Sequence, residues 1–426
     1  MTIKIRKKNI YIVIAFFALL FPYLQGSIGL LTGKLAYCFM PVLAIALAFL
    51  YNPKRVAFNA KELVVWTCIL FPCVFRNYDI KTGYNNVLNF IVVFAIYKIL
   101  REKEEWMTIF WKVVRFYCVV HFALGIFFLF NKGLLYSWVI PRFTMKGNVY
   151  NLLTKAISNG YMTGICNHYS KMGMYMALGT VAYATPLFES STINAHKKFQ
   201  YALFGAFIIG LAMTGKRGPL LFTLLALFLA FIQFANKKPT KKALIRLFIG
   251  IMVIILVFLF AYLKIPQIKL LIARFMEGSS IADKANGRIE FFWVQAIDMF
   301  KSNPLLGYGW GAFKSYSMNG NDAHNIYFQL LAETGMVGFW LSMAFFVGSL
   351  VVTKRDLGYI EKIPEKADLS VSLKLAYSYQ IFFLLYGLTG NPLYDGQCYL
   401  PYLISCAIGW SVYFSNTNKV REMGYE

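Results

Sequence analysis

The sequence predicts an all-α polytopic membrane protein, and its composition, its apolar runs and the placement of its charges support that prediction. Hydrophobic residues make up 58% of the 426 residues and charged residues only 15%, whereas a soluble protein carries about 25% charge. Apolar runs of about 20 residues recur along the chain, and each can cross a hydrocarbon layer of about 30 Å. Backbone groups cannot stay unpaired in lipid, so these spans are expected to be α-helices.

These runs predict about twelve transmembrane helices within a single integral membrane domain, residues 1–426. The spans are expected at residues 10–30, 35–51, 62–76, 84–100, 108–130, 171–188, 198–214, 218–235, 243–265, 325–352, 370–389 and 398–415. The third and fourth are the weakest of these runs.

The net charge of +24 follows membrane topology and does not indicate a nucleic-acid surface. Basic clusters stand at residues 4–8, 54–55 and 237–242, before or between apolar runs. Lys and Arg gather on the cytoplasmic side of membrane proteins, so these clusters and both termini are predicted to be cytoplasmic. The first apolar run has no convincing small-residue cleavage site and is expected to remain as the first span. No nucleic-acid partner is expected.

Two long polar segments, residues 131–170 and 266–324, fall on the outer side of this topology. Long loops are uncommon in compact proteins and are often functional. The cytoplasmic connections are short and leave no room for a catalytic domain. Any chemistry is therefore expected at the outer face of the membrane.

The larger outer loop is expected to carry short amphipathic structure, above all a helix at residues 288–301. Its apolar residues recur at helical spacing, with Glu290, Asp298 and Lys301 on the opposite side. Such a helix lies in the membrane interface or caps the helix bundle. The Gly307–Gly311 run that follows is not preceded by a strand, as a nucleotide-binding loop would be. We predict instead a turn that lets the backbone approach the membrane surface.

Arginine residues at the outer face are candidates for binding an anion. Arg217 lies with Lys216 in the short turn Thr214–Pro219, whose glycines leave these two cations little freedom. The guanidinium fork suits phosphate oxygens and stays ionised in partly dry sites. The long loops supply three further candidates, Arg142, Arg274 and Arg288. Snorkelling to lipid headgroups is the alternative role for each of them.

His324 and Asn325 stand where the second loop enters an apolar run. An imidazole there can act near neutral pH as a base or a hydrogen-bond donor, although a lone His is more often scaffolding. Glu333 follows about two and a half turns later, on the opposite side of the predicted helix, so the two are not expected to form an acid–base pair. A carboxylate at that depth needs a partner, and structural pairing is its expected role. No residue spacing indicates a metal site, and neither a metal nor a cofactor is expected.

Taken in order along the chain, these features resemble the O-antigen ligase and O-antigen polymerase family. The motifs are the Gly215–Pro219 turn, Gly287-Arg288, the stretch from Asn303 to Gly309, and His324-Asn325 followed by Gly335 and Gly338. The predicted topology covers the whole chain, whereas the specific motifs cover only about residues 214–340.

The resemblance implies a metal-independent, inverting glycosyltransferase whose donor is a glycan on a polyprenyl diphosphate in the outer leaflet. Carried onto this sequence, Arg217 and Arg288 would hold the diphosphate, and His324 would orient or deprotonate the acceptor hydroxyl. The further substrate-binding candidates are Lys216, Arg142, Arg274, Asn325 and Tyr308. Expected partners are the polyprenyl-diphosphate-linked oligosaccharide, membrane lipid, a flippase and a chain-length regulator protein.

Two activities within this family stay open, with a carrier as a third alternative. In a ligase, small hydroxyl residues are expected after the second Gly of the motif, whereas Phe339-Trp340 follow Gly338 here. That difference favours a polymerase of a surface polysaccharide (O-antigen, capsule or exopolysaccharide), which extends a lipid-linked chain by its own repeat unit. A ligase would pass the glycan to lipid A-core or another acceptor. A lipid or anionic-solute carrier should bury ionisable residues near mid-membrane, whereas the candidate cations here are expected at the outer face.

Overall fold

The described part of the chain is helical. The computed structural model describes residues 60–78, 80–142, 147–166, 168–184, 188, 195–235, 262–263, 269, 292–317 and 320–422. Within these ranges no residue forms a β-strand, and the extended pairing is an isolated bridge between Asn77 and Trp310. The predicted all-α class is therefore confirmed for the described residues.

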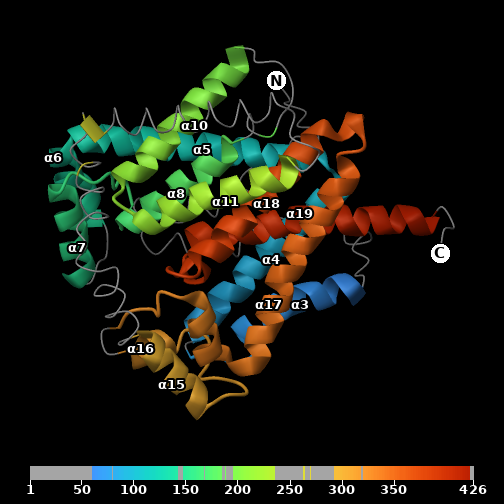
Figure 1. Ribbon diagram of the computed structural model, residues 1–426. Helices are drawn as coiled ribbons and strands as arrows, with labels where there is room; N and C mark the ends of the chain where they lie inside the picture. Colours follow the sequence, from blue (N-terminus) through green and yellow to red (C-terminus); the bar gives the residue numbers. More distant parts are fainter. Residues whose placement is uncertain are drawn as a thin grey trace, which may run out of the picture.

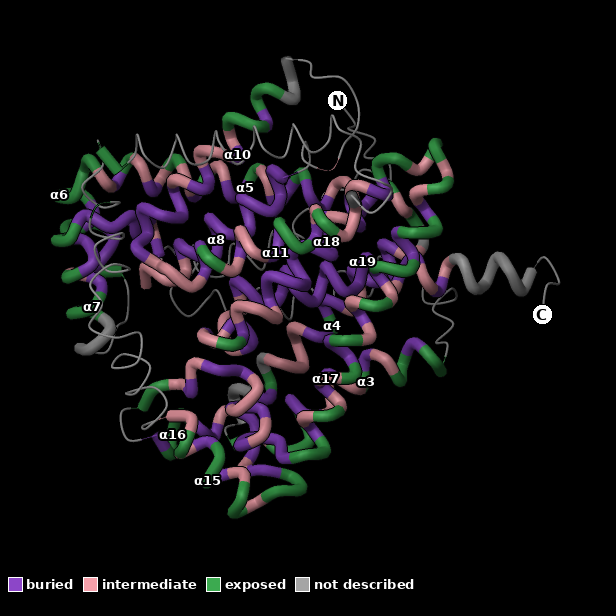
Figure 2. The backbone as a smooth tube through the Cα atoms, in the orientation of Figure 1, coloured by how far each residue is buried: buried purple, intermediate pink, exposed green. Residues whose placement is uncertain are grey.

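Five helices form the central layer of the molecule (Figure 1): α3 (Ala60–Val74), α4 (Ile80–Glu102), α17 (Ile326–Ile360), α18 (Ala367–Tyr386) and α19 (Gly396–Glu422). α19 packs against α4 and α18, and α17 packs against α3, α18 and α19. The contacts are largely aromatic, as in the Phe383–Tyr402 stack with ring centroids 3.8 Å apart. Much of α18 and α19 is buried (Figure 2), because helices that are apolar on all sides must be enclosed by other helices or by lipid.

A second layer consists of α5 (Glu105–Phe130), α8 (Tyr169–Ala182), α10 (Ala195–Met213) and α11 (Arg217–Ala235). α8 contacts α5, α10 and α11, while α11 lies along α18 of the central layer. A small residue lets α8 and α10 approach closely, since a Cβ on Gly179 would lie 2.4 Å from the Phe207 ring. α8 is thus enclosed by its neighbours, and its first turn lies against the turn that opens α11.

Three described helices are long and apolar enough to cross a membrane: Glu105–Phe130, Arg217–Phe234 and Ile326–Ile360. They coincide with the spans predicted at 108–130, 218–235 and 325–352. The shorter apolar helix Lys198–Met213 coincides with the span predicted at 198–214. The spans expected at 10–30 and 35–51, and nearly all of 243–265, lie outside the described residues, so the number of about twelve stays a prediction.

The first long outer loop folds into short helices: α6 (Lys132–Leu134), the π-turn η3 (Leu135–Val139), the 3-10 turn η4 (Ile140–Arg142) and α7 (Gly147–Ser158). These helices enclose a small apolar cluster of their own, which includes Val139 and Leu153. In Figure 1 they project from one end of the second layer.

The second long loop carries α15 (Val294–Ser302) and α16 (Phe313–Tyr316). α15 buries Ala296 and Met299 and exposes Asp298 and Lys301, as its predicted amphipathic pattern requires. It packs on α17, and the rings of Trp293 and Phe328 lie 5.5 Å apart there. This helix therefore caps the bundle. Two 3-10 turns complete the described elements, η6 (Pro364–Lys366) and η7 (Pro392–Tyr394).

Candidate functional site

The polar segments that connect the helices converge at one end of the bundle, which we call the loop end. It comprises residues 161–166, 168–171, 214–218, 303–317, 320–325 and 386–395. The amide N–H of Ile326 donates to the Gly387 carbonyl at 2.9 Å, and a Cβ on Gly218 would lie 3.3 Å from the Tyr386 ring. Tyr394 stacks on Trp310 with centroids 4.9 Å apart. Segments far apart in sequence thus meet where the sequence predicts the site.

His324 lies at the centre of the loop end, in an unusual backbone conformation. Its φ is +54°, and among the described residues it is the one non-glycine residue with a positive φ. An L-residue rarely adopts this region, and such outliers gather at functional sites. Its ring and that of Phe292 form a T-shaped contact, with centroids 5.9 Å apart.

Asn325 caps the N-terminus of α17. Its Oδ1 accepts hydrogen bonds from the amides of Tyr327 and Phe328 at 3.0 and 3.2 Å, and its Nδ2 donates to the Leu388 carbonyl at 3.2 Å. An asparagine in this position satisfies amides that the first helical turn leaves unpaired. The side-chain amide of Asn325, a predicted substrate-binding residue, therefore connects the start of α17 to the end of α18.

The Lys216-Arg217 turn faces the first turn of α8. Gly215 has a φ of +69°, and a Cβ there would lie 2.5 Å from the Tyr161 ring, so only glycine fits. The Lys216 ammonium lies over the ring of Tyr169, 3.9 Å from its centroid. Arg217, the first residue of α11, is partly buried. The sequence prediction of two cations with little freedom agrees with this packing.

His168 belongs to the same cluster. Burial and the neighbouring charges of Lys216, Lys171 and His324 lower the pKa of His168 to about 4. Its Nδ1 accepts a hydrogen bond of 3.1 Å from the Ser170 amide and caps α8. The neutral ring therefore carries its proton on Nε2, as a hydrogen-bond donor. His168 thus lies within the electrostatic reach of both Lys216 and His324.

Two carboxylates complete the charged groups of the loop end. Burial raises the pKa of Asp395. The charge of Lys171 lowers this pKa in part, and the charge of Asp322 raises it further. The Asp395 carboxylate accepts from the Gln397 amide at 3.3 Å, and Asp322 lies 3.8 Å from the Lys314 ammonium. The site can therefore meet an anion with its cations and a hydroxyl-bearing sugar with its carboxylates and histidines.

The Gly307–Gly311 segment docks on a break in α17 at Gly335. Gly335 has φ 61° and ψ −167°, which are not helical angles. The amides of Met336 and Val337 donate to the carbonyls of Pro304 and Leu305 at 2.8 and 3.2 Å. In return, the amides of Tyr308 and Gly309 donate to the carbonyls of Ala332 and Glu333 at 3.1 and 2.7 Å. The loop thus satisfies the backbone groups that the break frees.

Two glycines make this docking possible. A Cβ on Gly307 would lie 2.4 Å from the Glu333 backbone, and a Cβ on Gly335 would lie 2.4 Å from the Leu305 backbone. The backbone of the Gly307–Gly311 run thus lies against α17, whereas its predicted approach to the membrane surface stays a prediction.

Glu333 anchors this junction. Its buried carboxylate accepts hydrogen bonds from the amides of Gly311 (2.9 Å) and Phe313 (3.1 Å), from Gln329 Nε2 (3.1 Å) and from the Tyr394 hydroxyl. The prediction that a carboxylate at this depth needs partners is confirmed, and its role is structural pairing, as expected.

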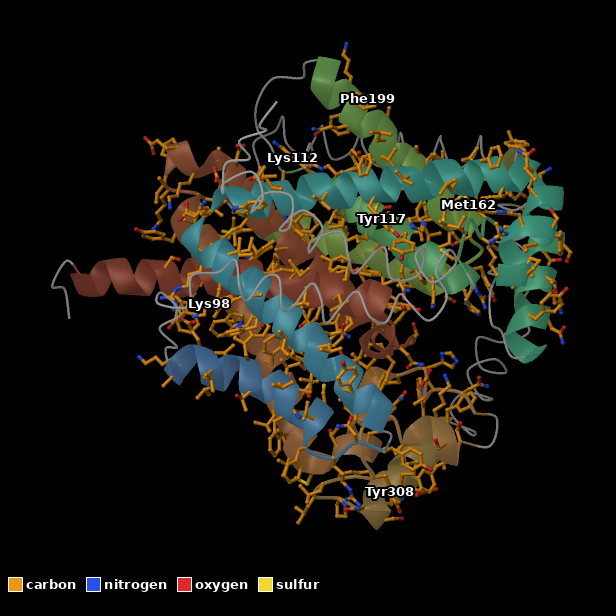
Figure 3. All side chains as sticks on the ribbon, turned by 180° about the vertical axis from the view of Figure 1, so that it is seen from behind. Lys98, Lys112, Tyr117, Met162, Phe199 and Tyr308 are labelled. Atoms are coloured by element: carbon orange, nitrogen blue, oxygen red, sulfur yellow. The ribbon has the colours of Figure 1, made fainter. Side chains whose placement is uncertain are left out.

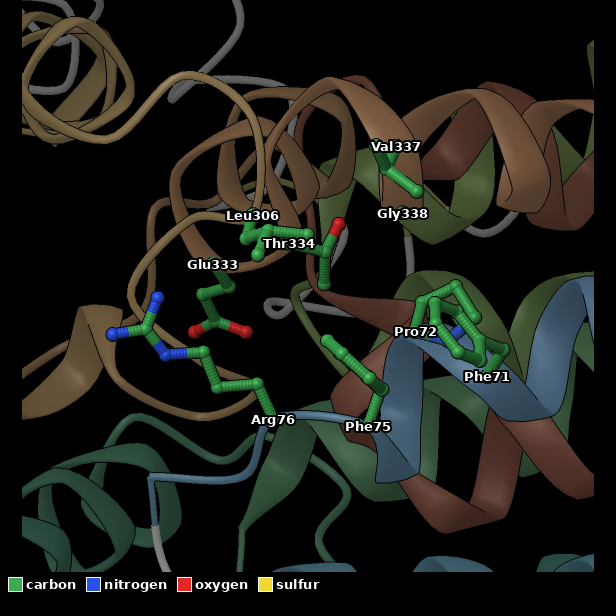
Figure 4. A pocket seen from close by; sticks show the side chains of 9 residues that line it. All are labelled: Phe71, Pro72, Phe75, Arg76, Leu306, Glu333, Thr334, Val337 and Gly338. Atoms are coloured by element: carbon green, nitrogen blue, oxygen red, sulfur yellow. The ribbon is translucent and has the colours of Figure 1, made fainter.

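A small pocket opens beside Glu333, between α3 and the break in α17 (Figure 4). Its walls are mainly apolar, and it is lined by Phe71, Pro72, Phe75, Arg76, Leu306, Glu333, Thr334, Val337 and Gly338. Arg76 Nη1 donates to the Gly307 carbonyl at 2.7 Å, so this arginine also fastens the glycine segment to α3.

The comparison with known families agrees with this site. Residues 202–343 match the family model for O-antigen ligase. The match supports the resemblance to the O-antigen polymerase and ligase family, and it includes Arg217, His324 and the glycines of the α17 break. No curated protein matches the chain. The match supports a role in the O-antigen type of surface-polysaccharide biosynthesis, and the apolar helices support a membrane location.

Of the predicted substrate-binding residues, Arg142 lies outside the loop end, and Tyr308 lies within it on the Gly307–Gly311 segment. Arg142 is exposed beyond η3, where its guanidinium stacks on Trp138, 4.3 Å from the ring centroid. Tyr308 packs against Tyr316 with centroids 5.2 Å apart, at the far end of the molecule from Phe199 (Figure 3). Arg274 and Arg288 lie outside the described residues, so their roles stay predictions.

Several polar residues in and beside the loop end gave no signal in the sequence: Arg76, Lys171, Gln329, Tyr394 and Asp395. Each lies in or beside an apolar run with no motif of its own. Arg76 and Tyr394 form hydrogen bonds with segments far away in the chain, which local spacing does not indicate.

Proposed function

We propose that the protein is a polymerase of a surface polysaccharide. It transfers a glycan from a polyprenyl diphosphate onto the lipid-linked repeat unit of a second molecule, at the outer face of the bacterial cytoplasmic membrane. The observation that carries the proposal is the strained His324, held at the loop end beside a cationic turn, within the segment that matches O-antigen ligase.

In this proposal, the cations bind the leaving group. Arg217 and Lys216 face the diphosphate, whose negative charge grows as the sugar–phosphate bond breaks. Fixed donors in a site shielded from water stabilise that charge best. Arg288 is expected to add a second guanidinium, as the family resemblance implies.

His324 acts on the acceptor. Its imidazole takes the proton of the attacking hydroxyl while the new bond to the anomeric carbon forms and the bond to the diphosphate oxygen breaks. Attack from the face opposite the diphosphate inverts the anomeric centre. The products are the lengthened lipid-linked glycan, polyprenyl diphosphate and a proton. The step requires neither a metal nor a nucleotide.

A ligase is the second candidate, favoured by the description of the matching family model. The same residues would serve it, because only the acceptor differs. The Phe339-Trp340 pair after the second glycine supports the polymerase instead. Trp340 is 63% exposed on the described surface, so a bulky ring stands where a ligase is expected to have a small hydroxyl residue.

A carrier of lipid or anionic solute is the third candidate. In the described part of the chain, the candidate cations Lys216 and Arg217 lie in one turn of the loop end, as an enzyme at a membrane surface requires. Transport without bond formation would nonetheless use a similar anion site.

The identity of the glycan acceptor tests the proposal. Purified protein in liposomes receives a fluorescent lipid-linked repeat unit, either alone or with a separate lipid A-core acceptor. Label on longer lipid-linked glycans without the separate acceptor supports the polymerase. Label only on lipid A-core indicates the ligase, and label that crosses the bilayer unchanged indicates the carrier.

A further inference from the structure

One buried side chain holds the backbone that precedes His324. Gln329 is fully buried in the first turns of α17. Its Oε1 accepts a hydrogen bond of 3.0 Å from the Ala323 amide, and its Nε2 donates to the Asp322 carboxylate at 3.3 Å. The side chain therefore reaches back over one helical turn and binds the two residues before the histidine.

The hydrogen-bond network fixes the orientation of the Gln329 amide. Nε2 also donates to Glu333 Oε1 at 3.1 Å. A backbone amide can only donate, so the Gln329 oxygen must face Ala323 and its nitrogen must face the two acids. Glu333 in turn is held by the Gly311 and Phe313 amides. The segment before His324 is thus tied to the junction at the α17 break.

The segment after His324 is fixed as well. Asn325 caps α17, and the Ile326 amide donates to the Gly387 carbonyl at 2.9 Å. A non-glycine residue at φ +54° keeps that conformation only where its surroundings over-determine it. Gln329 provides that constraint on the N-terminal side, and the Asn325 cap provides it on the C-terminal side.

We propose that Gln329 is a positioning residue for His324: it fixes the Asp322–Ala323 peptide and so sets the direction in which the imidazole meets the acceptor hydroxyl. This inference rests on the role proposed for His324 above. Gln329 itself is buried and does not contact the substrate. Its loss should therefore lower the rate of transfer and leave substrate binding unchanged.

The test compares Gln329→Leu with Gln380→Leu. Gln380 is a matched control, because it is also buried and its Nε2 donates to Thr353 Oγ1 and the Ser405 carbonyl at 3.0 Å each, away from the loop end. Transfer kinetics per folded molecule give kcat and KM. The rate at which diethyl pyrocarbonate modifies His324, followed by peptide mass spectrometry, reports the setting of the imidazole without any substrate.

We expect Gln329→Leu to lower kcat by about 100-fold, as displacement of a reacting group by about 1 Å does, with KM unchanged and an altered rate of His324 modification. Gln380→Leu should lower thermal stability and leave kcat and the modification rate at wild-type values. If Gln329→Leu does not insert, Gln329→Met serves in its place. It keeps the length of the side chain, but loses the amide donors to both acids and the carbonyl acceptor.

Wild-type kcat and wild-type His324 modification in the Gln329 variants would overturn the inference. Equal losses in the Gln329 and Gln380 variants would do so too, because they would show a general packing effect. Should the wild-type protein fail to lengthen the glycan, the proposed function fails, and the modification rates still decide whether Gln329 positions His324.

Discussion

The break in α17 predicts a strong dependence on Gly335. Replacing it with Ala adds a Cβ 2.4 Å from the Leu305 carbonyl carbon, at φ +61° and ψ −167°. That backbone region is nearly exclusive to glycine and costs another residue about 1–3 kcal/mol. Relieving the overlap with the Leu305 backbone costs about 1–3 kcal/mol more. Gly335→Ala should therefore destabilise the protein by about 2–6 kcal/mol.

Gly358 offers a control in the same helix. A Cβ there meets nothing within 4 Å, and its φ is not positive. Ala is favoured over Gly in a helix interior by about 1 kcal/mol, so Gly358→Ala should leave stability unchanged or slightly raised.

Thermal unfolding of the detergent-solubilised protein, followed by tryptophan fluorescence, measures both variants. We expect the midpoint of Gly335→Ala to fall by several degrees and that of Gly358→Ala to stay at or above the wild-type value. A Gly335→Ala midpoint equal to that of the wild type would refute the reasoning, because the glycine segment could not then dock on α17 as the structure describes.

Two further predictions concern the charged groups of the loop end. Arg217→Lys should lose most transfer activity while the protein still inserts, because a point charge cannot replace the guanidinium fork. Near-normal activity of this variant in a glycan-transfer assay would remove Arg217 from the site. The control is Arg246→Lys, outside the described residues and predicted at a cytoplasmic helix end, which should keep wild-type activity. His168 binds a proton near pH 6.5 when unfolded and near pH 4 when folded, so its contribution to stability is complete above about pH 6.5 and is lost as the pH falls towards 4, by at most about 3 kcal/mol. His168→Asn keeps a capping acceptor but does not titrate. In chemical denaturation, its free energy of unfolding should fall less between pH 7 and 4 than that of the wild type. An equal fall would contradict the lowered pKa of His168.

The helices in long apolar runs could be predicted from the sequence, because a helix that crosses a membrane or a buried core needs apolar residues along its length. The sequence also predicted that Lys216, Arg217 and His324 belong to one face of the membrane. The break at Gly335 was visible only as a glycine in an apolar run, since its cause lies in the backbone of residues 304–309. The partners of Glu333 were equally hidden, because Gly311 and Tyr394 approach it from separate loops.

The sequence also could not tell which charged residues join the site. Arg142 was grouped with Arg217 by charge and topology alone, yet the helices of the first loop hold it against Trp138. Lys171 and Asp395 gave no signal in sequence, because the effect of the Lys171 charge on Asp395 depends on how α8 and the turn before α19 pack. Tertiary contacts, which spacing along the chain does not encode, select the members of the site.

The length of the lipid-linked glycan is the most direct measurement of the proposed activity. Purified protein in liposomes receives a polyprenyl-diphosphate oligosaccharide as its sole substrate, and mass spectrometry follows the products of the wild type and of His324→Ala. The account predicts a ladder spaced by the mass of one repeat unit in the wild type and none in His324→Ala. No lengthening by the wild type, or the same ladder from His324→Ala, would contradict it.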